Sequence, residues 1–529
     1  MATTGAIVMK SSDRSQVLVL GDNPVDEEPF VQRKLSRTLV TREQLGDNTI
    51  TNNACGVLLA PFPGKFGLVQ LFFEKDFFRI CQLGLKTAVY VTEKKPQIIE
   101  IRNSTYVRLK VYEEIADFAK RLEQFDLLEW VYLGEELWTI AETFARHNPG
   151  PELGNPAIDM GSMPFPLDLD TETILKRAFS DCDRITIERL MGGKTAKETF
   201  RVFANLAGPE SGPQPMPFFV KVGSSETIAE EKANYRFLAD PFIPFYLRPS
   251  LNEKRSVRTL INSALVCNFV ESAISLRDSL RTGQGDCAIF SLFEITLRGL
   301  RAHTLKAAKK KGVLDSFFDP NNGRIKVREI GENYPARIAR LNKFKKVRHP
   351  ELVYEALRKC AARVETREGV YHGDLHAGNI MVRNRDAIVI DFGSMNYFGP
   401  LSADPSLLEV SLVFGTDDYD DPNSYIIWRR FVDYIFADPL IPPLPRGDYH
   451  QFGWLHKAIR ELRHVVSCCG VEREEAMLIL GGYLLRFGRL APRELKSKKL
   501  MELAEKRSVY ALVVADQISK KLEERHATL

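Results

Sequence analysis

The chain has 529 residues, of which 44% are hydrophobic and 27% charged, and its formal net charge is +4. This length predicts two or three domains, and the composition is that of a globular protein rather than a disordered or fibrous one. The nearly balanced charge excludes a chain that is basic or acidic as a whole, so any charged binding surface must be local.

Eight cysteines are scattered without a CxxC pair, and two of them, Cys468 and Cys469, are adjacent. This pattern predicts neither a disulfide framework nor a zinc site, which favours a reducing compartment and a cytoplasmic protein. The N-terminus has no apolar stretch of signal-peptide length, and no run approaches the ~18 apolar residues of a membrane span. We therefore expect no association with a membrane.

Residues 1–147 alternate apolar runs with amphipathic segments, which is typical of a small three-layer α/β domain with a largely parallel sheet. Strands are predicted at 17–20, 56–60, 88–92 and 98–101, and helices at 68–83 and 111–125. Asp22 follows the first strand and suggests a receiver-like domain, but no aspartate closes strand 88–92, where we expect a phosphoacceptor. An interaction or sensory module, open to a protein partner, is favoured over a second active site.

Residues 148–170 contain five prolines and three glycines, which predicts a linker or a clamped, irregular strap between domains. In the next region, 171–271, we expect strands at 185–190, 199–204, 218–222 and 264–270, and a helix at 226–238. Gly192 and Gly193 lie between the first two strands, where glycines let backbone N–H groups approach phosphate oxygens; an ordinary hairpin turn fits equally well. The segment is not a Walker A loop, because Glu188 stands where that motif needs its first glycine.

Lys221 lies inside the apolar strand 218–222. A buried ammonium group needs an anionic partner, and Glu230 and Glu231 follow on the predicted helix. An edge-strand lysine that reaches the solvent is the alternative.

The segment 306–348 contains 13 lysines and arginines against four acidic residues, a local charge of about +9. Such a segment could attract an acidic or phosphate-rich partner, although a solvated surface insert is the more ordinary interpretation. The region from 272 to the end is otherwise predicted to be mostly helical. Helices are expected at 287–308, 405–414, 424–436, 450–468, 472–487 and in a last segment that ends near residue 525.

The most informative stretch is 369–395, GVYHGDLHAGNIMVRNRDAIVIDFGSM. Asp374 and Asn379 lie in a glycine-containing loop, strands are predicted at 380–382 and 387–390, and Asp391 follows the second strand. Two carboxylates and an amide suit Mg²⁺, which prefers oxygen ligands, and one acid could accept a hydroxyl proton as phosphoryl transfer requires. A buried turn that only joins two strands is the alternative.

HGDLHAGN followed by VIDFG resembles the catalytic and metal-binding loops of the aminoglycoside phosphotransferase and choline kinase family, within the protein-kinase-like superfamily. The resemblance covers roughly residues 180–415 and does not include the N-terminal domain. It implies an α+β bilobal fold with an antiparallel-sheet N-lobe at 171–271 and a mostly helical C-lobe at 272–529. It also implies transfer of the γ-phosphate of ATP to a hydroxyl acceptor, with Mg²⁺.

The resemblance assigns catalytic and metal-binding roles. Asp374 would accept or orient the hydroxyl proton, and Asn379 and Asp391 would hold Mg²⁺. His372 joins the catalytic group, where it would order the loop backbone rather than shuttle protons. His376 receives no definite role.

The resemblance also assigns nucleotide contacts. Lys221 would neutralise phosphate charge, and Glu231, or alternatively Glu230, would position it. Gly192 and Gly193 would cover the nucleotide, whereas Cys267 and Phe269 would lie in the adenine pocket.

The acceptor stays open among a small-molecule hydroxyl, a sugar and a protein side chain, because Asp391 is followed by Phe392 and Gly393, as in protein kinases. The basic segment weighs against a polycationic acceptor if it lies near the active site. The rival hypothesis is a nucleotide-binding pseudokinase or scaffold in a multi-protein signalling or defence system.

Overall fold

The computed structural model describes most of the chain from residue 151 onward and only secondary-structure segments before it. The described residues are 16–20, 28–33, 35–40, 42–45, 54–59, 86–91, 97–101, 104–108, 128–132, 141, 151, 153–161, 165–190, 198–208, 212–259, 262–285, 287–320, 323–325, 347–438, 447–489 and 495–528. Asp22, the predicted helices 68–83 and 111–125, Gly192, Gly193 and most of the basic segment lie outside them.

The described chain forms two compact units, residues 1–232 with 250–269 and residues 233–249 with 270–529. The units divide near residue 270, and residues 233–249, which lie within the range predicted for the N-lobe, belong to the second unit. The reason is visible in two contacts, an edge-to-face pair between the rings of Tyr235 and Phe392 and a hydrogen bond from Asn234 Nδ2 to the carbonyl of Gly393.

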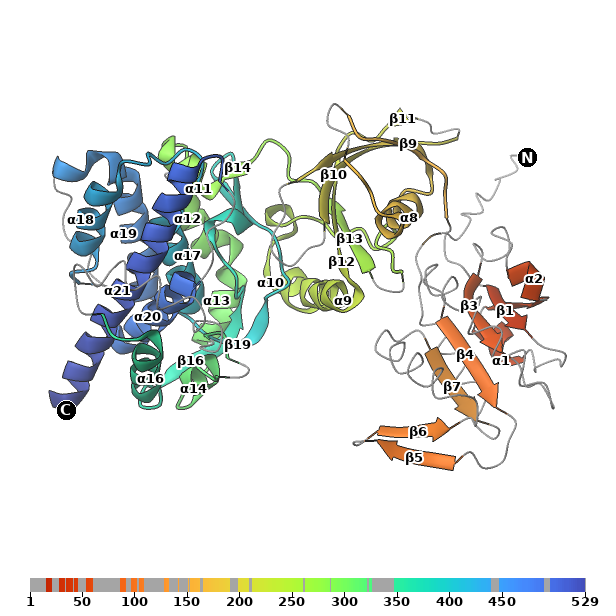
Figure 1. The fold of residues 1–529 in the computed structure, drawn as a ribbon, viewed down its shortest axis with the longest axis horizontal. Helices are drawn as coiled ribbons and strands as arrows, with labels where there is room; N and C mark the ends of the chain where they lie inside the picture. The colour runs from red at the N-terminus through yellow and green to blue at the C-terminus, as the bar shows by residue number, and fades with distance from the viewer. Residues whose placement is uncertain are drawn as a thin grey trace, which may run out of the picture. The chain divides into compact units, whose positions relative to one another are not determined.

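The N-terminal part of the first unit contains a five-stranded parallel sheet in the order β2-β1-β3-β4-β7 (Figure 1). Its strands are β1 (Gln16–Leu20), β2 (Ser36–Val40), β3 (Ala54–Leu59), β4 (Lys86–Val91) and β7 (Leu128–Tyr132), with the short helices α1 (Glu28–Gln32) and α2 (Arg42–Leu45). This is the 2-1-3-4-5 order of doubly wound domains such as receivers. The predicted strand 98–101 instead forms β5 (Gln97–Ile101), an antiparallel hairpin with β6 (Ser104–Arg108).

The third strand of this sheet along the chain is β3, not the 88–92 run, because β2 was not predicted. Strand β2 has no clear alternation of apolar and polar residues, which explains the omission. A receiver's phosphoacceptor would therefore follow β3, where the next residue is Ala60. The corrected strand order brings no aspartate to that position.

A second sheet, in the same unit, is antiparallel except for the strand that comes first along the chain, which is parallel to its neighbour. It has the order β13-β12-β10-β9-β8, and β11 pairs with β10. The strands are β8 (Ala157–Asp159), β9 (Cys182–Arg189), β10 (Glu198–Leu206), β11 (Gly212–Pro213), β12 (Phe218–Ser224) and β13 (Asn262–Asn268). The antiparallel sheet predicted within residues 171–271 is therefore present.

Two helices pack on this sheet, one on each face. Successive side chains of a strand point to opposite faces of a sheet. Helix α8 (Leu169–Ala178) shares a buried cluster with Val220, Val222 and Val266, while Ile228 of α9 (Ser225–Asn234) packs against Leu265 and Cys267. Lys221 stands between Val220 and Val222 in the strand. Its side chain therefore points to the opposite face from theirs, which is the face that α9 covers.

The segment predicted as a linker contributes to this sheet. Strand β8 pairs in parallel with β9, and Phe165 stacks on Phe200 with ring centroids 5.9 Å apart. Asp168 then caps helix α8 by accepting from the backbone N–H of Thr171. Prolines and glycines mark irregular backbone here, but the apolar residues between them are packed rather than solvated.

The second unit is mainly helical, as predicted (Figure 1). Helix α9 continues through a π-helical turn, η1 (Tyr235–Ala239), and α10 (Asp240–Phe242), and η2 (Phe245–Leu247) follows. The later helices are α11 (Leu276–Arg281), α12 (Ala288–Ser291), η3 (Leu292–Thr296), α13 (Arg298–Leu305), α14 (Val313–Phe317), α16 (Pro350–Ala361), α17 (Ala403–Phe414), α18 (Tyr425–Ile435), η5 (Gly447–Phe452), α19 (Gly453–Cys468), α20 (Arg473–Arg489) and α21 (Lys498–Thr528). None of the described helices is long and apolar enough to span a membrane.

Two small sheets lie among these helices. One has the order β14-β17-β18 and the other β15-β16-β19. Their strands are β14 (Ile274–Ser275), β15 (Lys309–Lys310), β16 (Thr366–Tyr371), β17 (Ile380–Arg383), β18 (Asp386–Val389) and β19 (Asn396–Pro400). The 369–395 stretch thus runs from β16 through the short helix η4 (Ala377–Asn379) into the β17–β18 hairpin.

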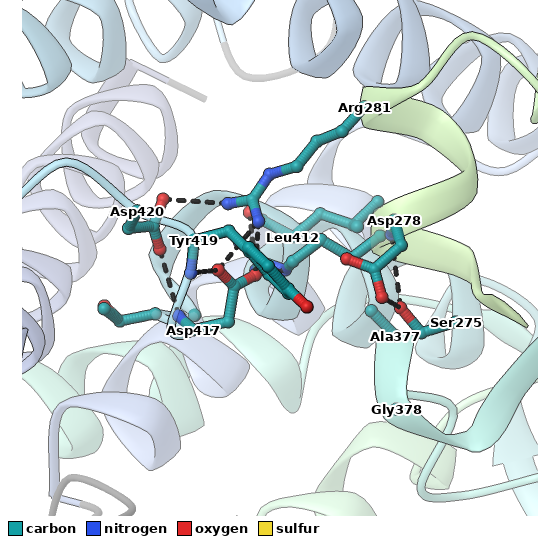
Figure 2. A network of polar contacts seen from close by, with 12 residues as sticks. Ser275, Asp278, Arg281, Ala377, Gly378, Leu412, Asp417, Tyr419 and Asp420 are labelled. Atoms are coloured by element: carbon teal, nitrogen blue, oxygen red, sulfur yellow. Dashed lines mark hydrogen bonds and ion pairs between the residues drawn. The ribbon is translucent and has the colours of Figure 1, made fainter. Parts of the chain in front are cut away.

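A partly buried ion-pair network holds the loop that follows α17 (Figure 2). Arg281 contacts Asp417 at 2.7 Å and Asp420 at 2.9 Å, and Arg507 contacts Asp420 at 3.0 Å. A third arginine, Arg277, donates to the carbonyl of Ser411 in α17 and lies 3.5 Å from Asp417. The network ties α11, α17 and α21 together and thereby supports the base of the 373–379 loop described next.

Candidate active site

The loop from Gly373 to Asn379 is held by α17. Asp404, in the first turn of that helix, accepts from the backbone N–H groups of His372 at 2.8 Å and Gly373 at 3.0 Å. Ser411 Oγ, two turns later, accepts from the N–H of Ala377 at 3.0 Å. Gly373 has φ +78°, and a Cβ there would come within 2.2 Å of the carbonyl oxygen of Ser394, so only glycine suits the position.

Asn379 and Asp391 lie at the same end of the β17–β18 hairpin. The backbone N–H of Ile390 donates to the carbonyl of Asn379 at 3.0 Å. Asn379 is therefore paired, through its backbone, with the residue that directly precedes Asp391. Asn379 Nδ2 donates to the backbone carbonyl of Asp374 at 2.9 Å. This bond occupies the amide NH₂ and leaves Oδ1 as the atom that could bind a cation.

Asp391 has φ +62°, a left-handed backbone that non-glycine residues seldom adopt and that is frequent at functional sites. The donor set of one amide oxygen and one carboxylate fits Mg²⁺, which keeps several waters or phosphate oxygens in its coordination shell. No group of three or more His, Cys, Asp or Glu side chains that could hold a metal occurs among the described residues, so a metal here would depend on this smaller set.

Asp374 is surrounded by positive charge. Its Oδ1 lies 3.1 Å from Arg324 Nη2 and 3.5 Å from Arg486 Nη2, and its Oδ2 lies 3.8 Å from His376 Nε2. Burial alone would raise the pKa of this carboxyl, but the charges of His376, Arg324 and Arg486 outweigh burial and hold the pKa below its ordinary value of 3.8. Asp374 is therefore ionised at neutral pH and can accept a hydrogen bond.

His372 is fully buried, and the backbone occupies both of its ring nitrogens. Nε2 lies 3.2 Å from the carbonyl of Ile390, and Nδ1 accepts from the N–H of Asp374 at 3.4 Å. These two backbone contacts fit the predicted role of His372 in ordering the loop, and its place in the catalytic group stays a prediction. His376 is more exposed and caps η4 through a bond from the N–H of Gly378.

Lys221 and Glu231 form a buried ion pair in the first unit. The Lys221 ammonium lies 2.8 Å from Glu231 Oε2, and the two side chains are 6% and 3% exposed. Glu230, the alternative partner, is exposed. An ammonium group has three N–H donors, so Lys221 could contact phosphate oxygens while it keeps Glu231.

We predict that Glu231→Gln weakens ATP binding about tenfold or more, because it removes the charge that holds Lys221 in place. Titration of ATP into the variant by calorimetry measures the effect. Glu230→Gln is the matched control and should bind ATP as the wild type does. Equal weakening in both variants would remove Glu231 from the positioning role.

The adenine prediction concerns Cys267 and Phe269. The Cys267 side chain is 4% exposed and packs with Ile228 and Leu265, and the backbone N–H of Phe269 donates to the carbonyl of Pro217 at 3.0 Å. The ring of Phe269 lies 4.7 Å from the guanidinium of Arg201. An adenine ring would therefore have to use other backbone groups near these residues, and their role stays a prediction.

Three residues of the site were not predicted from the sequence: Arg324, Asp404 and Arg486. Arg324 comes from the basic segment, 50 residues before Asp374, and Arg486 from α20, 112 residues after it. Asp404 offered a signal, because an aspartate followed by Pro405 marks a first helical turn. For Arg324, the only local signal was a Gly-Arg-Ile sequence within an otherwise charged stretch.

Comparison with known proteins gives one family and several structures. The model of the "Phosphotransferase enzyme family" matches residues 310–408, which include the 373–379 loop and Asp391. No curated protein matches. Similar solved structures include the aminoglycoside phosphotransferase APH(4)-Ia, at 14% identity and TM-score 0.37 over 66% of this chain and 97% of that one.

Two further solved structures are kinases of sugar derivatives. A putative fructosamine-3-kinase from Haemophilus somnus is 14% identical, with TM-score 0.33, over 62% of this chain and 90% of that one. A glucosamine kinase in complex with glucosamine, ADP and inorganic phosphate is 14% identical, with TM-score 0.30, over 69% of this chain and 88% of that one. At these identities, none of them assigns an activity to this chain, which is similar to the phosphotransferase family over residues 310–408.

Proposed function

We propose that this protein is an ATP- and Mg²⁺-dependent phosphotransferase that moves the γ-phosphoryl group to a hydroxyl acceptor. The observation that carries the proposal is the loop in which the backbone carbonyl of Asp374 holds the amide of Asn379, beside Asp391 at the end of the hairpin. One ionised carboxylate and two cation-binding side chains are what such a transfer needs.

The chain's own residues would act as follows. Asp374 orients the acceptor hydroxyl and takes its proton while the acceptor oxygen bonds to the γ-phosphorus and the bond from that phosphorus to ADP breaks. Asn379 and Asp391 hold the metal ion. Lys221, kept in place by Glu231, neutralises phosphate charge. Bound Mg²⁺ would withdraw charge from the phosphate oxygens.

The two remaining nucleotide contacts are proposed on the resemblance alone. Gly192 and Gly193 would cover the phosphates, and the backbone near Cys267 and Phe269 would receive adenine. The six cysteines whose side chains the structure describes are free thiols, which supports a reducing compartment such as the cytoplasm. The N-terminal parallel sheet would serve as an interaction or sensory module.

We expect Asp391→Asn to raise the Mg²⁺ concentration needed for half-maximal phosphate transfer by about tenfold or more, since a charged ligand becomes neutral. The measurement is the rate of ADP formation from ATP across a Mg²⁺ titration, with a chelator as the metal-free point. Asp386→Asn, at the exposed first residue of β18 at the other end of the same hairpin, is the matched control and should leave the titration unchanged.

The same assay separates the enzyme from a scaffold. Binding of ATP with Mg²⁺, but no transfer to any compound in a broad acceptor panel, would overturn the proposal in favour of a nucleotide-binding scaffold.

A further inference from the structure

Two arginines converge on the carboxylate proposed to orient the acceptor. Arg324 and Arg486 approach the same oxygen, Asp374 Oδ1, and Arg324 also donates to the carbonyl of Gly373. Each arginine side chain is 21% exposed, and Asp374 is 33% exposed, so a ligand at this carboxylate would meet both guanidinium groups. Two guanidinium groups thus lie beside this carboxylate, and Arg324 also acts on the buried carboxyl of Asp404.

The position of Arg324 is built by its neighbours. The N–H of Gly323 donates to the carbonyl of Asp319 at 2.9 Å, and a Cβ on Gly323 would come within 2.4 Å of the backbone nitrogen of Asp319. On the other side, Ile325 is 1% exposed, and its N–H donates to the carbonyl of Phe317. The hydrogen bond of Gly323 and the buried side chain of Ile325 therefore hold the backbone on both sides of Arg324.

Arg486 is held on a different element, helix α20. Its neighbour Tyr483, one turn earlier, is buried at 1% exposure and packs edge-to-face on Phe317, the residue that also receives the N–H of Ile325. The two arginines therefore approach Asp374 from two elements that are packed together. The main electrostatic influences on Asp374 are all basic: His376, Arg324, Arg486 and His372.

We propose that the acceptor is a small hydroxyl compound that carries an anionic group, a phosphate or a carboxylate, close to the hydroxyl, and that Arg324 and Arg486 bind this group. The inference rests on the proposed function and specifies its substrate class. Both arginine contacts use Oδ1 of Asp374, whereas Oδ2 lies 3.8 Å from His376 Nε2. Oδ2 is thus available to the acceptor hydroxyl, while the guanidinium groups, whose planar forks match phosphate and carboxylate, receive the anion.

The same charges disfavour cationic acceptors. A polycationic aminoglycoside would bring ammonium groups against Arg324 and Arg486, and like charges at this range are repulsive in a partly buried site. This extends the sequence-based expectation about the basic segment, because Arg324 belongs to that segment.

The test uses four compounds that share the glucose ring: glucose, glucosamine, glucose 6-phosphate and glucuronate. ADP formation is measured for the wild type, Arg324→Met and the control Arg358→Met, which removes an exposed arginine on α16. We expect the two anionic compounds to have a KM at least tenfold lower than glucose, and glucosamine to be the poorest. Arg324→Met should raise the KM of the anionic compounds about 10- to 100-fold relative to the KM of glucose. Comparison of glucose 6-phosphate with glucuronate shows which anion is preferred.

A fall in kcat for all four compounds in Arg324→Met would overturn the inference, because the arginine would then act on the transferred group. A preference for glucose or glucosamine over the anionic compounds would also overturn the inference. It would not contradict the proposed phosphotransferase function. Calorimetric binding of glucose 6-phosphate and glucuronate, at saturating ADP, is the readout that does not need turnover. No binding, or equal binding by the wild type and Arg324→Met, overturns the inference whether or not phosphate transfer occurs. Binding weakened by the substitution, without any transfer, supports the anion site and rejects the phosphotransferase.

Discussion

Asp374→Asn is expected to reduce phosphate transfer by about 10²- to 10⁴-fold, the usual contribution of a general base. Asparagine has the same shape but cannot take a proton at neutral pH. The loss should appear in kcat rather than in the affinity for ATP, because the proposed nucleotide contacts of Lys221 lie elsewhere in the sequence.

The structure separates this effect from misfolding. Asn379 is held by the backbone carbonyl of Asp374, and Asp404 holds the backbone of His372 and Gly373, so neither bond involves the Asp374 side chain. Asp374→Asn does remove the carboxylate that Arg324 and Arg486 face, so its thermal midpoint should fall somewhat below that of Asp315→Asn, which changes an exposed aspartate on α14, while the protein stays folded at the assay temperature. Activity near that of the wild type in Asp374→Asn would remove this carboxylate from the mechanism.

The pH dependence gives a second check on Asp374. Since its pKa is held below 3.8, the ionised form persists across the neutral and mildly acidic range, and activity should fall only as the pH approaches the lowered pKa. Removal of Arg324 takes away a charge that favours the ionised form. The acidic limb of the kcat profile should accordingly move to higher pH in Arg324→Met and stay in place in Arg358→Met.

The parts of this protein that were predictable from the sequence are local in the chain. The β17–β18 hairpin and Asp391 follow from an apolar run, a short polar turn at Asn384 and Arg385 with positive φ, and a second apolar run. The apolar surroundings of Lys221 likewise predict a buried ammonium with a nearby acid. In each case, the residues that decide the structure are within about a dozen positions of one another.

The missed parts depend on distant contacts. Nothing near Arg324 in the sequence indicates that Ile325 is buried against α20, where Gly482 leaves room for it: a Cβ on that glycine would lie 3.1 Å from the Ile325 side chain. Without this contact, Arg324 is one of many basic residues in a charged segment. Strand β8 was missed for a similar reason, because its pairing with β9 depends on apolar residues that lie between prolines.

Asp420→Asn is expected to destabilise the helical unit by about 3–5 kcal/mol, the range for removal of one partner of a buried ion pair. Arg277, Arg281 and Arg507 share the carboxylates of Asp417 and Asp420, and Arg507 is only 2% exposed. Once Asp420 is neutral, three guanidinium groups remain around a single carboxylate. Arg507 keeps its bond to the carbonyl of Gly415, but its buried charge loses the anion it faces.

Urea unfolding followed by circular dichroism measures this loss, and Asp418→Asn is the matched control. Asp418 is in the same loop, but its side chain is 30% exposed and pairs with Lys496, which is 76% exposed, so its removal should cost less than about 1 kcal/mol. Equal unfolding midpoints in the two variants would show that water screens the network around Asp420 as well.

The direction of the pKa shift of Asp420 predicts how the unfolding free energy depends on pH. Burial raises the pKa of Asp420, but Arg507, Arg277 and Arg281 outweigh burial and lower it below 3.8. A carboxyl with a depressed folded-state pKa stabilises the protein above its unfolded-state pKa, and this stabilisation is lost as the pH falls through the lowered value. The difference in unfolding free energy between the wild type and Asp420→Asn should therefore be full at neutral pH and narrow below pH 3.8.

Because Arg277 also donates to the carbonyl of Ser411, whose hydroxyl accepts from the N–H of Ala377, loss of the network should loosen the 373–379 loop and lower phosphate transfer before the protein unfolds.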